Sequence, residues 1–137
     1  MRILVDTSIW VDFLNGYPSL EQATLAALLK SDHDICTCGV VIAEVFQGLR
    51  RDKGREGFTQ SFRELIYLDP SGVDLYFRAA EIYRLLRARG LTVRSTIDCL
   101  IAALAEESGA ALLARDRDMK IILESGLVRA LRWPVAG

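Results

Sequence analysis

Five carboxylates stand in or beside apolar runs, where hydrophobic patterning alone would not place them. Asp6 directly follows Ile-Leu-Val, and Glu44 interrupts Val-Val-Ile-Ala-Glu-Val-Phe. Asp98 lies within Thr-Ile-Asp-Cys-Leu-Ile-Ala-Ala. Asp116 follows Ala-Ala-Leu-Leu-Ala-Arg, and Asp118 comes two residues later. Polar residues normally occupy loops and exposed helix faces, so these acids are candidates for chemistry.

Carboxylates that converge without a cation repel one another and are unfavourable to bury. A hard divalent ion removes that repulsion, and Mg²⁺ or Mn²⁺ takes oxygen ligands while keeping several waters. Such a site suits in-line displacement at phosphorus, because the metal activates water and neutralises phosphate oxygens. We therefore predict that Asp6, Glu44, Asp98 and Asp116 are catalytic metal ligands, with Asp118 as a further ligand that acts through water.

Each acid also has an ordinary explanation when it is taken alone. Asp6 suits a helix cap after a strand, and Asp98 suits the first turn of a helix, where the helix dipole favours a negative charge. Asp116 and Asp118 fit a capped turn, and Glu44 fits a helix surface or a pair with a distant arginine. Four such coincidences at one sheet edge are less probable than one shared site.

The elements that must position these acids alternate between short apolar strands and helices. Strands are expected at 3–5, 35–37, 66–68, 111–114 and 128–133. Helices are expected from Asp6 to Gly16, from Pro18 to about Ser31, and from Gly39 to about Arg51. Further helices are expected over 58–65, 73–89, from Ser95 or Thr96 to Gly109, and over 118–125. The segment 50–57 reads as a charged loop, and Pro134 to Gly137 as a loose tail.

This alternation predicts an α/β fold with a mainly parallel sheet flanked by helices. The length of 137 residues fits a single compact domain spanning 1–137. Asp6 and Asp116 each fall at the carboxyl end of a predicted strand, the edge at which open parallel sheets bind ligands. Asp98 and Glu44, each early in a helix, can face the same edge.

Composition narrows the class of protein further. The net charge of −1 excludes a strongly cationic nucleic-acid binder, so attraction to RNA would come from local basic patches or bound metal. No stretch reads as a signal peptide or membrane span, which predicts a cytoplasmic protein. Cys36, Cys38 and Cys99 are an odd number of cysteines without zinc-site spacing, which favours buried thiols in a reducing compartment.

Taken together, the motifs resemble the PIN-domain family and, within it, the VapC-type toxins of toxin–antitoxin pairs. The resemblance covers nearly the whole chain. It rests on Ile-Leu-Val-Asp6-Thr7-Ser8-Ile-Trp, Ile-Ala-Glu44-Val-Phe-Gln-Gly, Thr96-Ile-Asp98-Cys-Leu-Ile-Ala-Ala and Leu-Leu-Ala-Arg-Asp116-Arg-Asp118, in that order. The chain departs from the pattern at Met119, where an aromatic residue is expected.

The resemblance implies a PIN-like α/β domain with an acidic Mg²⁺ or Mn²⁺ site. It implies a metal-dependent endoribonuclease acting on cellular RNA, such as tRNA or ribosomal RNA. It also implies a homodimer that a cognate antitoxin protein holds inactive. Asp6, Glu44, Asp98 and Asp116 match the family's acidic positions, and Thr7 or Ser8 matches a hydroxyl that helps to place metal or phosphate.

Basic residues next to the acids are candidates for substrate binding. Arg115 and Arg117 could hold the scissile phosphate, or pair with Asp116 and Asp118. Two further basic groups fit either phosphate contact or solvated helix ends with favourable dipoles. These groups are Arg50, Arg51, Lys53 and Arg55, and then Arg84, Arg87, Arg89 and Arg94.

Two apolar surfaces are candidates for protein partners. The apolar helix from Val40 to Leu49 and the face formed by Trp10 and Phe13 are better explained as core. Part of that surface, with Leu20 to Leu29, could instead form a groove for a helix of the antitoxin. A dimer interface could form on the long helix, through Tyr76, Phe77, Tyr83 and Leu86.

Three other functions fit parts of the pattern. A haloacid-dehalogenase-like phosphatase needs a second Asp two residues after Asp6, where this chain has Ser8. A receiver-type phosphoacceptor needs paired acids near the first strand, and phosphate-binding glycine motifs are missing from the sequence. A catalytically silent RNA- or protein-binding module on the same fold is the remaining alternative, and the intact set of acids argues against it.

Overall fold

The computed structural model describes residues 1–49 and 54–135. The elements, in chain order, are β1 (Arg2–Val5), α1 (Thr7–Leu14), α2 (Leu20–Leu29), β2 (Asp34–Thr37), α3 (Gly39–Gln47), α4 (Arg55–Arg63), β3 (Ile66–Tyr67), α5 (Asp74–Ala88), α6 (Thr96–Ser108), β4 (Ala111–Leu113) and α7 (Arg117–Glu124). In the described residues, the alternation of strands and helices confirms the predicted α/β class.

The four strands form one parallel sheet in the order β3-β2-β1-β4. β1 is central: Leu4 pairs with Cys36 on one side and with Leu112 on the other. Because all four strands run the same way, their carboxyl ends meet at one edge of the sheet. The residues that follow β1 and β4 therefore come together there, although more than a hundred residues separate them in sequence.

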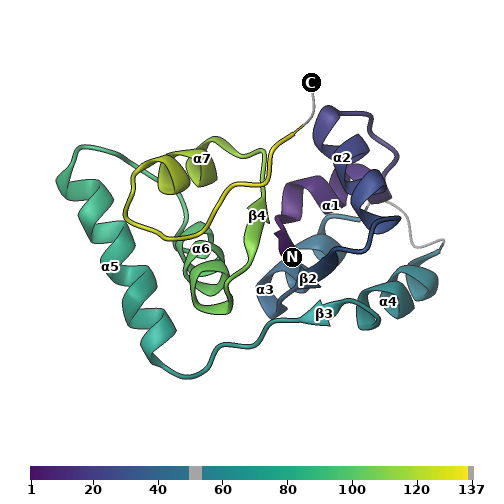
Figure 1. Cartoon of the computed structure of the whole chain (residues 1–137), viewed down its shortest axis with the longest axis horizontal. Helices are drawn as coiled ribbons and strands as arrows, with labels where there is room; N and C mark the ends of the chain where they lie inside the picture. Colours follow the sequence, from purple (N-terminus) through teal and green to yellow (C-terminus); the bar gives the residue numbers. More distant parts are fainter. Residues whose placement is uncertain (50–53, 136–137) are drawn as a thin grey trace.

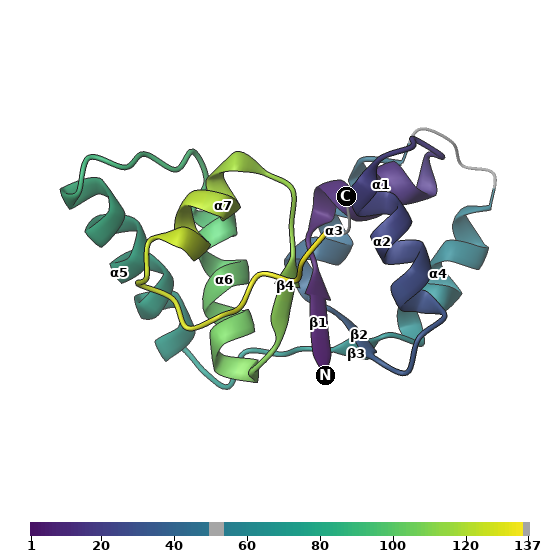
Figure 2. The ribbon, with the colours of Figure 1, turned by 45° about the horizontal axis from the view of Figure 1, so that its top comes forward.

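Helices cover both sides of this sheet. Figures 1 and 2 show α1, α2 and α4 on one side, and α5, α6 and α7 on the other. The connection from β3 to β4 crosses the whole sheet, so α5 and α6 lie on the side opposite the helices that link β1, β2 and β3. This crossover brings the start of α6 towards the end of β1. No helix of the described residues has the length and apolar character needed to cross a membrane.

The core lies where β1 and α6 are enclosed by other elements. Ile3, Leu4 and Val5 are fully buried, as expected for a central strand of a parallel sheet. In α6 the buried residues run without a break from Ile101 to Ala105, because sheet, α5 and α7 all surround this helix. Its first turn begins nearer the surface, where Thr96 is exposed and Asp98 is half-buried. The three cysteines are free and buried, which confirms their expected state.

The predicted fifth strand at 128–133 is wrong. The segment passes beside β4 but pairs with it through a single bridge between Leu112 and Arg132. Leu112 exchanges two backbone hydrogen bonds with it, to Leu131 and from Trp133, each of 2.8 Å. β4 is three residues long, and Pro134 has no N–H to extend a ladder, so the contact does not develop into a strand.

The boundaries around α3 and α4 differ from those predicted. α3 ends at Gln47, with Gly48 as its C-cap, rather than near Arg51, which lies outside the described residues. α4 begins at Arg55, inside the predicted loop 50–57. Gly54, at φ +87°, turns the chain into α4, a conformation that L side chains rarely adopt. Of the first basic group, Arg50, Arg51 and Lys53 lie outside the described residues.

The residues predicted to form a dimer surface on α5 do not share one face. Leu86 is fully buried in the core, which removes it from any exposed surface. Tyr76 and Phe77 are 55% and 72% exposed, and Tyr83 is half-buried. An α-helix turns through 3.6 residues, so Leu86 belongs to the apolar stripe that faces the core, together with Leu75, Ala79 and Ile82.

Candidate active site

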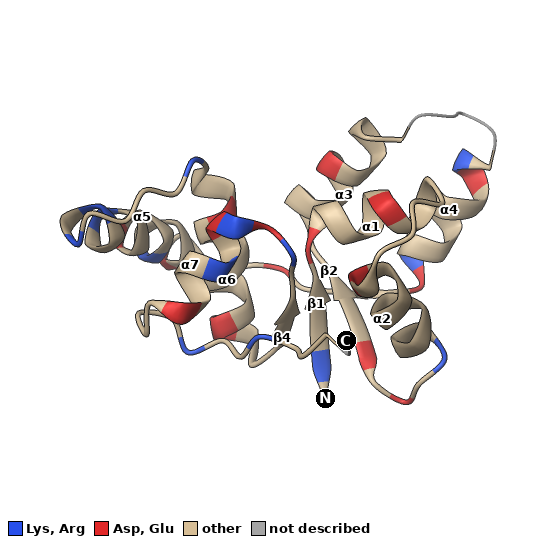
Figure 3. Ribbon diagram, turned by 90° about the horizontal axis from the view of Figure 1, so that it is seen from above, with Lys and Arg blue, Asp and Glu red and all other residues tan. Residues whose placement is uncertain are grey.

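Three carboxylates meet where α6 begins and β4 ends. Asp98 lies in the first turn of α6, Asp116 precedes α7, and Asp118 lies in the first turn of α7. One oxygen from each carboxylate lies within 4.8 Å of the others. Figure 3 shows acidic positions at the end of β1, on α3 and around the loop from β4 to α7, all at one end of the sheet. The triad thus brings together two of the four acids predicted to converge, Asp98 and Asp116, with Asp118 as the third member.

Asp6 is one of two buried acids of the group, with 4% of its surface exposed, the same fraction as for Asp118. It caps α1, accepting a hydrogen bond of 2.8 Å from the Thr7 amide, and its own amide bonds to Leu113 of β4. Burial raises the pKa of Asp6 to about 6 against the lowering effect of the Thr7 bond, and the charges of Asp116 and Glu44 raise it further. The ordinary role as a helix cap and the place in the acidic cluster therefore coexist.

Asp98 is the acid most strongly affected by its neighbours. Burial raises its pKa to about 7, with further contributions from the charge of Asp6 and from the charge and hydrogen bonding of Asp116. At neutral pH this carboxyl group therefore shares a proton with the cluster instead of being fully ionised. A cation with two positive charges would replace that proton, which is the behaviour of a site built for a metal.

Glu44 reaches the site from α3, on the other side of the sheet edge. The Thr7 hydroxyl donates a hydrogen bond of 2.9 Å to Glu44 Oε1. Thr7 is thus placed between Asp6, its neighbour in sequence, and Glu44, 37 residues away. No arginine pairs with Glu44 among the residues that the structure describes, so the alternative of a distant salt bridge finds no support.

The Thr7 hydroxyl can be removed without changing the size of the side chain. We expect Thr7→Val to lower metal-dependent activity on the order of tenfold to a hundredfold, because Glu44 loses the bond that fixes its carboxylate. Thr7→Ser keeps the hydroxyl and serves as the matched control. Initial reaction rates with added metal and melting temperatures would be compared for wild type, Thr7→Val and Thr7→Ser. Equal rates for the Val and Ser variants would contradict a positioning role for this hydroxyl.

Arg94, a member of the second basic group predicted to contact phosphate or to lie at a solvated helix end, makes the main basic contacts of the cluster. Its backbone amide and its Nε donate to Asp118 Oδ2 at 3.0 and 3.1 Å, and a terminal nitrogen lies 3.9 Å from Asp116 Oδ1. Burial alone would raise the pKa of Asp118, but these bonds from Arg94 outweigh it and hold the pKa below its usual value. Asp118 therefore stays ionised while Asp98 retains a proton.

The predicted substrate-binding arginines occupy different positions. Arg115 pairs with Asp12 of α1. The basic partner of Asp116 and Asp118 is Arg94 instead. Arg117 has an exposed side chain whose charge acts on Asp118. The Ser8 hydroxyl is buried and has no hydrogen-bond partner among the described residues.

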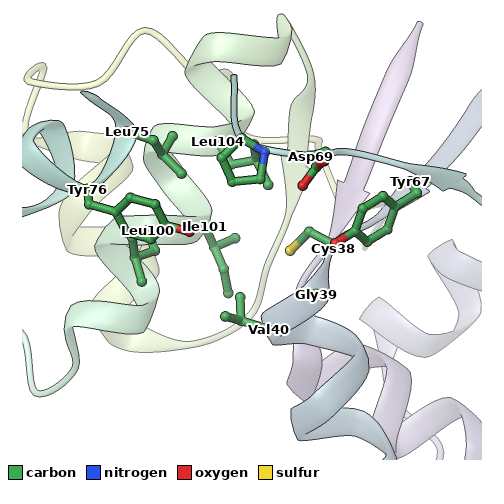
Figure 4. Close-up of a pocket in the computed structure, with 11 residues that line it drawn as sticks. Cys38, Gly39, Val40, Tyr67, Asp69, Leu75, Tyr76, Leu100, Ile101 and Leu104 are labelled. Atoms are coloured by element: carbon green, nitrogen blue, oxygen red, sulfur yellow. The ribbon is translucent and has the colours of Figure 1, made fainter. Parts of the chain in front are cut away.

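A separate cavity lies beside the site but contains none of its acids. Its volume is about 240 Å³, and it is enclosed by α3, α5, α6 and the segment after β3. Figure 4 shows Cys38 and Tyr67 facing Leu100 and Ile101 across it. The lining is mostly apolar, with Asp69 as its acidic member, so its chemistry differs from that of the carboxylate cluster.

The donor set at the acidic edge fits a hard divalent cation. Its ligand atoms are carboxylate oxygens, which Mg²⁺ and Mn²⁺ prefer, and no thiol or imidazole belongs to the described triad. The separation of up to 4.8 Å is slightly more than about 4.2 Å, twice a typical Mg–O distance, so a small closure or intervening water suffices. Burial and then repulsion from Asp6 and Asp116 raise the pKa of Asp98, and a bound cation would relieve that repulsion.

A parallel α/β sheet with clustered carboxylates at its carboxyl edge defines a class: compact domains built to hold a divalent cation there. Within that class the chain belongs to the PIN-domain family, whose family model matches residues 3–122. Ribonuclease VapC11 of Mycobacterium tuberculosis and VapC ribonuclease Mb1587 of Mycobacterium bovis are similar to it. Each is 35% identical over 121 residues, which are 88% of this chain and 90% of the relative.

Two solved structures share this fold. In the crystal structure of VapBC2 from Rickettsia felis bound to a DNA fragment from their promoter, the matching chain gives a TM-score of 0.71 at 22% identity. The match covers 98% of this chain and 100% of that one. FitAcB from Neisseria gonorrhoeae gives 0.63 at 20% identity, covering 88% and 92%. The predicted PIN-like fold is therefore confirmed.

Proposed function

We propose that this chain is a metal-dependent endoribonuclease and the toxin of a VapC-type toxin–antitoxin pair. The observation that carries the proposal is the convergence of Asp98, Asp116 and Asp118 at the sheet edge, with Asp6 coupled to them. The two mycobacterial relatives are named ribonucleases, which supports RNA as the substrate class. Cellular RNA such as tRNA or ribosomal RNA is the proposed target.

We expect the acids to bind the metal ion in different ways, according to their environments. Asp98 and Asp116 would hold Mg²⁺ or Mn²⁺ directly, together with Asp6, whose charge is felt by both. Asp118, already bonded to Arg94, would bind through water. When bound, the ion would supply an activated water and neutralise the phosphate oxygens.

Glu44 stands apart from the triad and is fixed by Thr7, so we propose that it completes the cation site from the α3 side. Its side chain is half-buried. Arg117, with its exposed guanidinium, remains a candidate for phosphate binding. Thr7 would act indirectly through Glu44, and Arg115 and Ser8 have no contact that favours a direct role.

Two protein partners belong to the proposal. The solved complexes VapBC2 and FitAcB support a cognate antitoxin that binds this chain. The exposed aromatic rings of Tyr76 and Phe77 on α5 support an association between two copies of the chain. An exposed apolar patch of this kind is typical of a protein interface.

The experiment that tests the function is cleavage of labelled total tRNA and ribosomal RNA by purified protein. Reactions would contain EDTA, Mg²⁺ or Mn²⁺, with wild type, Asp116→Asn and Asp34→Asn. Asp34→Asn makes the same chemical change at the exposed amino end of β2, the opposite edge of the sheet. We expect cleavage by wild type and Asp34→Asn with metal alone. RNA that stays intact under every condition would favour the silent binding module.

A further inference from the structure

We propose that Arg94 is a substrate-binding residue whose guanidinium contacts an RNA phosphate at the edge of the acidic cluster. The inference rests on the proposed function and selects, by its contacts, one arginine from the basic group for which the sequence left phosphate contact and a solvated helix end both open. Arg94 lies in the segment between α5 and α6, directly before Ser95, the N-cap of α6. The same short segment therefore begins the helix that carries Asp98 and places the positive charge of Arg94 near it.

The inner part of Arg94 is held firmly. Its backbone amide and its Nε both donate to the same oxygen of Asp118, at 3.0 and 3.1 Å. Only 4% of Asp118 is exposed, so the anchor itself is buried. Fixing Nε in this way orders the guanidinium before any ligand arrives, which reduces the side-chain entropy lost on binding.

The outer part of Arg94 is available to a ligand. Its side chain is 75% exposed, and the terminal nitrogen nearest to Asp116 lies 3.9 Å away, beyond hydrogen-bond distance. A guanidinium carries five N–H donors, and the bond from Nε uses one of them. The terminal N–H groups, which form a fork suited to phosphate oxygens, therefore remain at the solvent side of the carboxylates.

Fold stability does not account for this arrangement. An ion pair whose basic member is so exposed contributes little to folding, because water screens it. Asp118 would also keep the bond from the Arg94 amide with any residue at this position. The arginine side chain adds a positive charge at the solvent side of the acids. This charge would reduce their repulsion of an approaching RNA, which is itself a polyanion.

Other described arginines near this edge lack the same combination. Arg115 is committed to Asp12, and Arg89 donates to the Ser125 carbonyl. Arg117 is exposed and acts on Asp118 through its charge. Arg94 thus has a backbone amide and an Nε held by Asp118, together with free terminal N–H donors. Arg117 offers the same charge nearby without such bonds.

The test is binding of a short fluorescent single-stranded RNA of mixed sequence, measured by anisotropy in EDTA between about 50 and 200 mM KCl. Wild type, Arg94→Ala, Arg94→Lys and Arg63→Ala would be compared. We expect Arg94→Ala to weaken binding about fivefold and to reduce the slope of log affinity against log salt by about 0.7, the value for one phosphate on a single strand. Arg94→Lys should restore the slope but only part of the affinity, because lysine lacks the fork.

Arg63→Ala removes the same charge from the exposed last turn of α4, on the other side of the sheet, and should change affinity less than twofold. An equal loss in both alanine variants would overturn the inference, since it would show general attraction instead of a contact. Unchanged binding by Arg94→Ala would also overturn it. A loss of the Mn²⁺-dependent rise in melting temperature in Arg94→Ala would assign Arg94 to the metal site instead. If wild type cleaves RNA with metal while Arg94→Ala binds RNA normally, the proposed function stands and only the role of Arg94 fails.

Discussion

Replacing Asp98 by Asn should abolish cleavage and make the metal-free protein more stable. Loss of the charged oxygen at the centre of the cluster should reduce the rate of RNA hydrolysis at least a thousandfold, or by about 4 kcal/mol in activation free energy. The same change removes a carboxylate whose pKa is raised to about 7 by burial and by the charges of Asp6 and Asp116. In EDTA at pH 8 we expect a gain of about 1–2 kcal/mol in unfolding free energy, or roughly 5 °C.

The cleavage rate should fall while the stability of the metal-free protein rises, and this combination distinguishes a metal ligand from a structural residue. A residue with a purely structural role would lose activity and stability together when it is substituted. Asp34→Asn is the control, because it removes one negative charge at the opposite edge of the sheet. It should alter neither the rate nor the melting temperature by a comparable amount. An Asp98→Asn protein that cleaves RNA at the wild-type rate would remove Asp98 from the active site.

The second large effect is on the pH dependence of stability. In the folded protein the pKa values of Asp6 and Asp98 are raised to about 6 and about 7, above the ordinary value of 3.8. The folded state therefore binds protons that the unfolded state has released, and stability falls as pH rises from about 4 to about 7. In EDTA we expect a loss on the order of 2 kcal/mol across this window, or roughly 6 °C in melting temperature.

A bound cation should reverse that dependence. Mn²⁺ binds the ionised carboxylates, so its stabilising effect should grow with pH where the metal-free protein loses stability. Thermal unfolding between pH 5 and pH 8, with EDTA and then with Mn²⁺, measures both trends. The lowered pKa values of Asp118 and Glu106 act only below their ordinary range and do not oppose the trend in this window. A melting temperature that rises with pH in EDTA would contradict the electrostatic description of the cluster.

The general position of the acids was predictable because strand ends are visible in sequence. Asp6 and Asp116 each follow an apolar run, and parallel strands place the residues that follow them at one edge. Asp98 was predictable from the first turn of an apolar helix. The role of Asp118 was less visible, because its burial depends on contacts between α7 and the segment before α6.

The side-chain partners within the site were not predictable. Arg94 bonds to Asp118 across 24 residues, and Arg115 pairs with Asp12 across 103. Each pair joins segments that only the finished fold brings together, and hydrophobic periodicity carries no information about it. Pairing with the nearby Asp116 and Asp118 was one of two roles considered for Arg115, yet Arg115 pairs with Asp12 of α1.

The sequence pattern also overestimated the sheet at its β4 edge. The run from Val128 to Trp133 has the apolar character of a strand, and two of its members, Val128 and Ala130, are buried. The first part of the segment does bury alternate residues, but ladder pairing requires a neighbour long enough to pair with. β4 offers three residues, so a single bridge to Arg132 is formed.

The pairing of β1 with β4 has a consequence for the time at which activity can arise. Asp6 is made at the start of synthesis, but Asp98, Asp116 and Asp118 follow nearly a hundred residues later or more, and they reach Asp6 only after β4 has joined β1. Contacts of such long sequence separation form late, because the intervening chain must first be ordered. A nascent chain from which β4 has not yet emerged therefore lacks the complete set of acids, and under the proposed function it would not cleave RNA before the last quarter of the chain has emerged and folded.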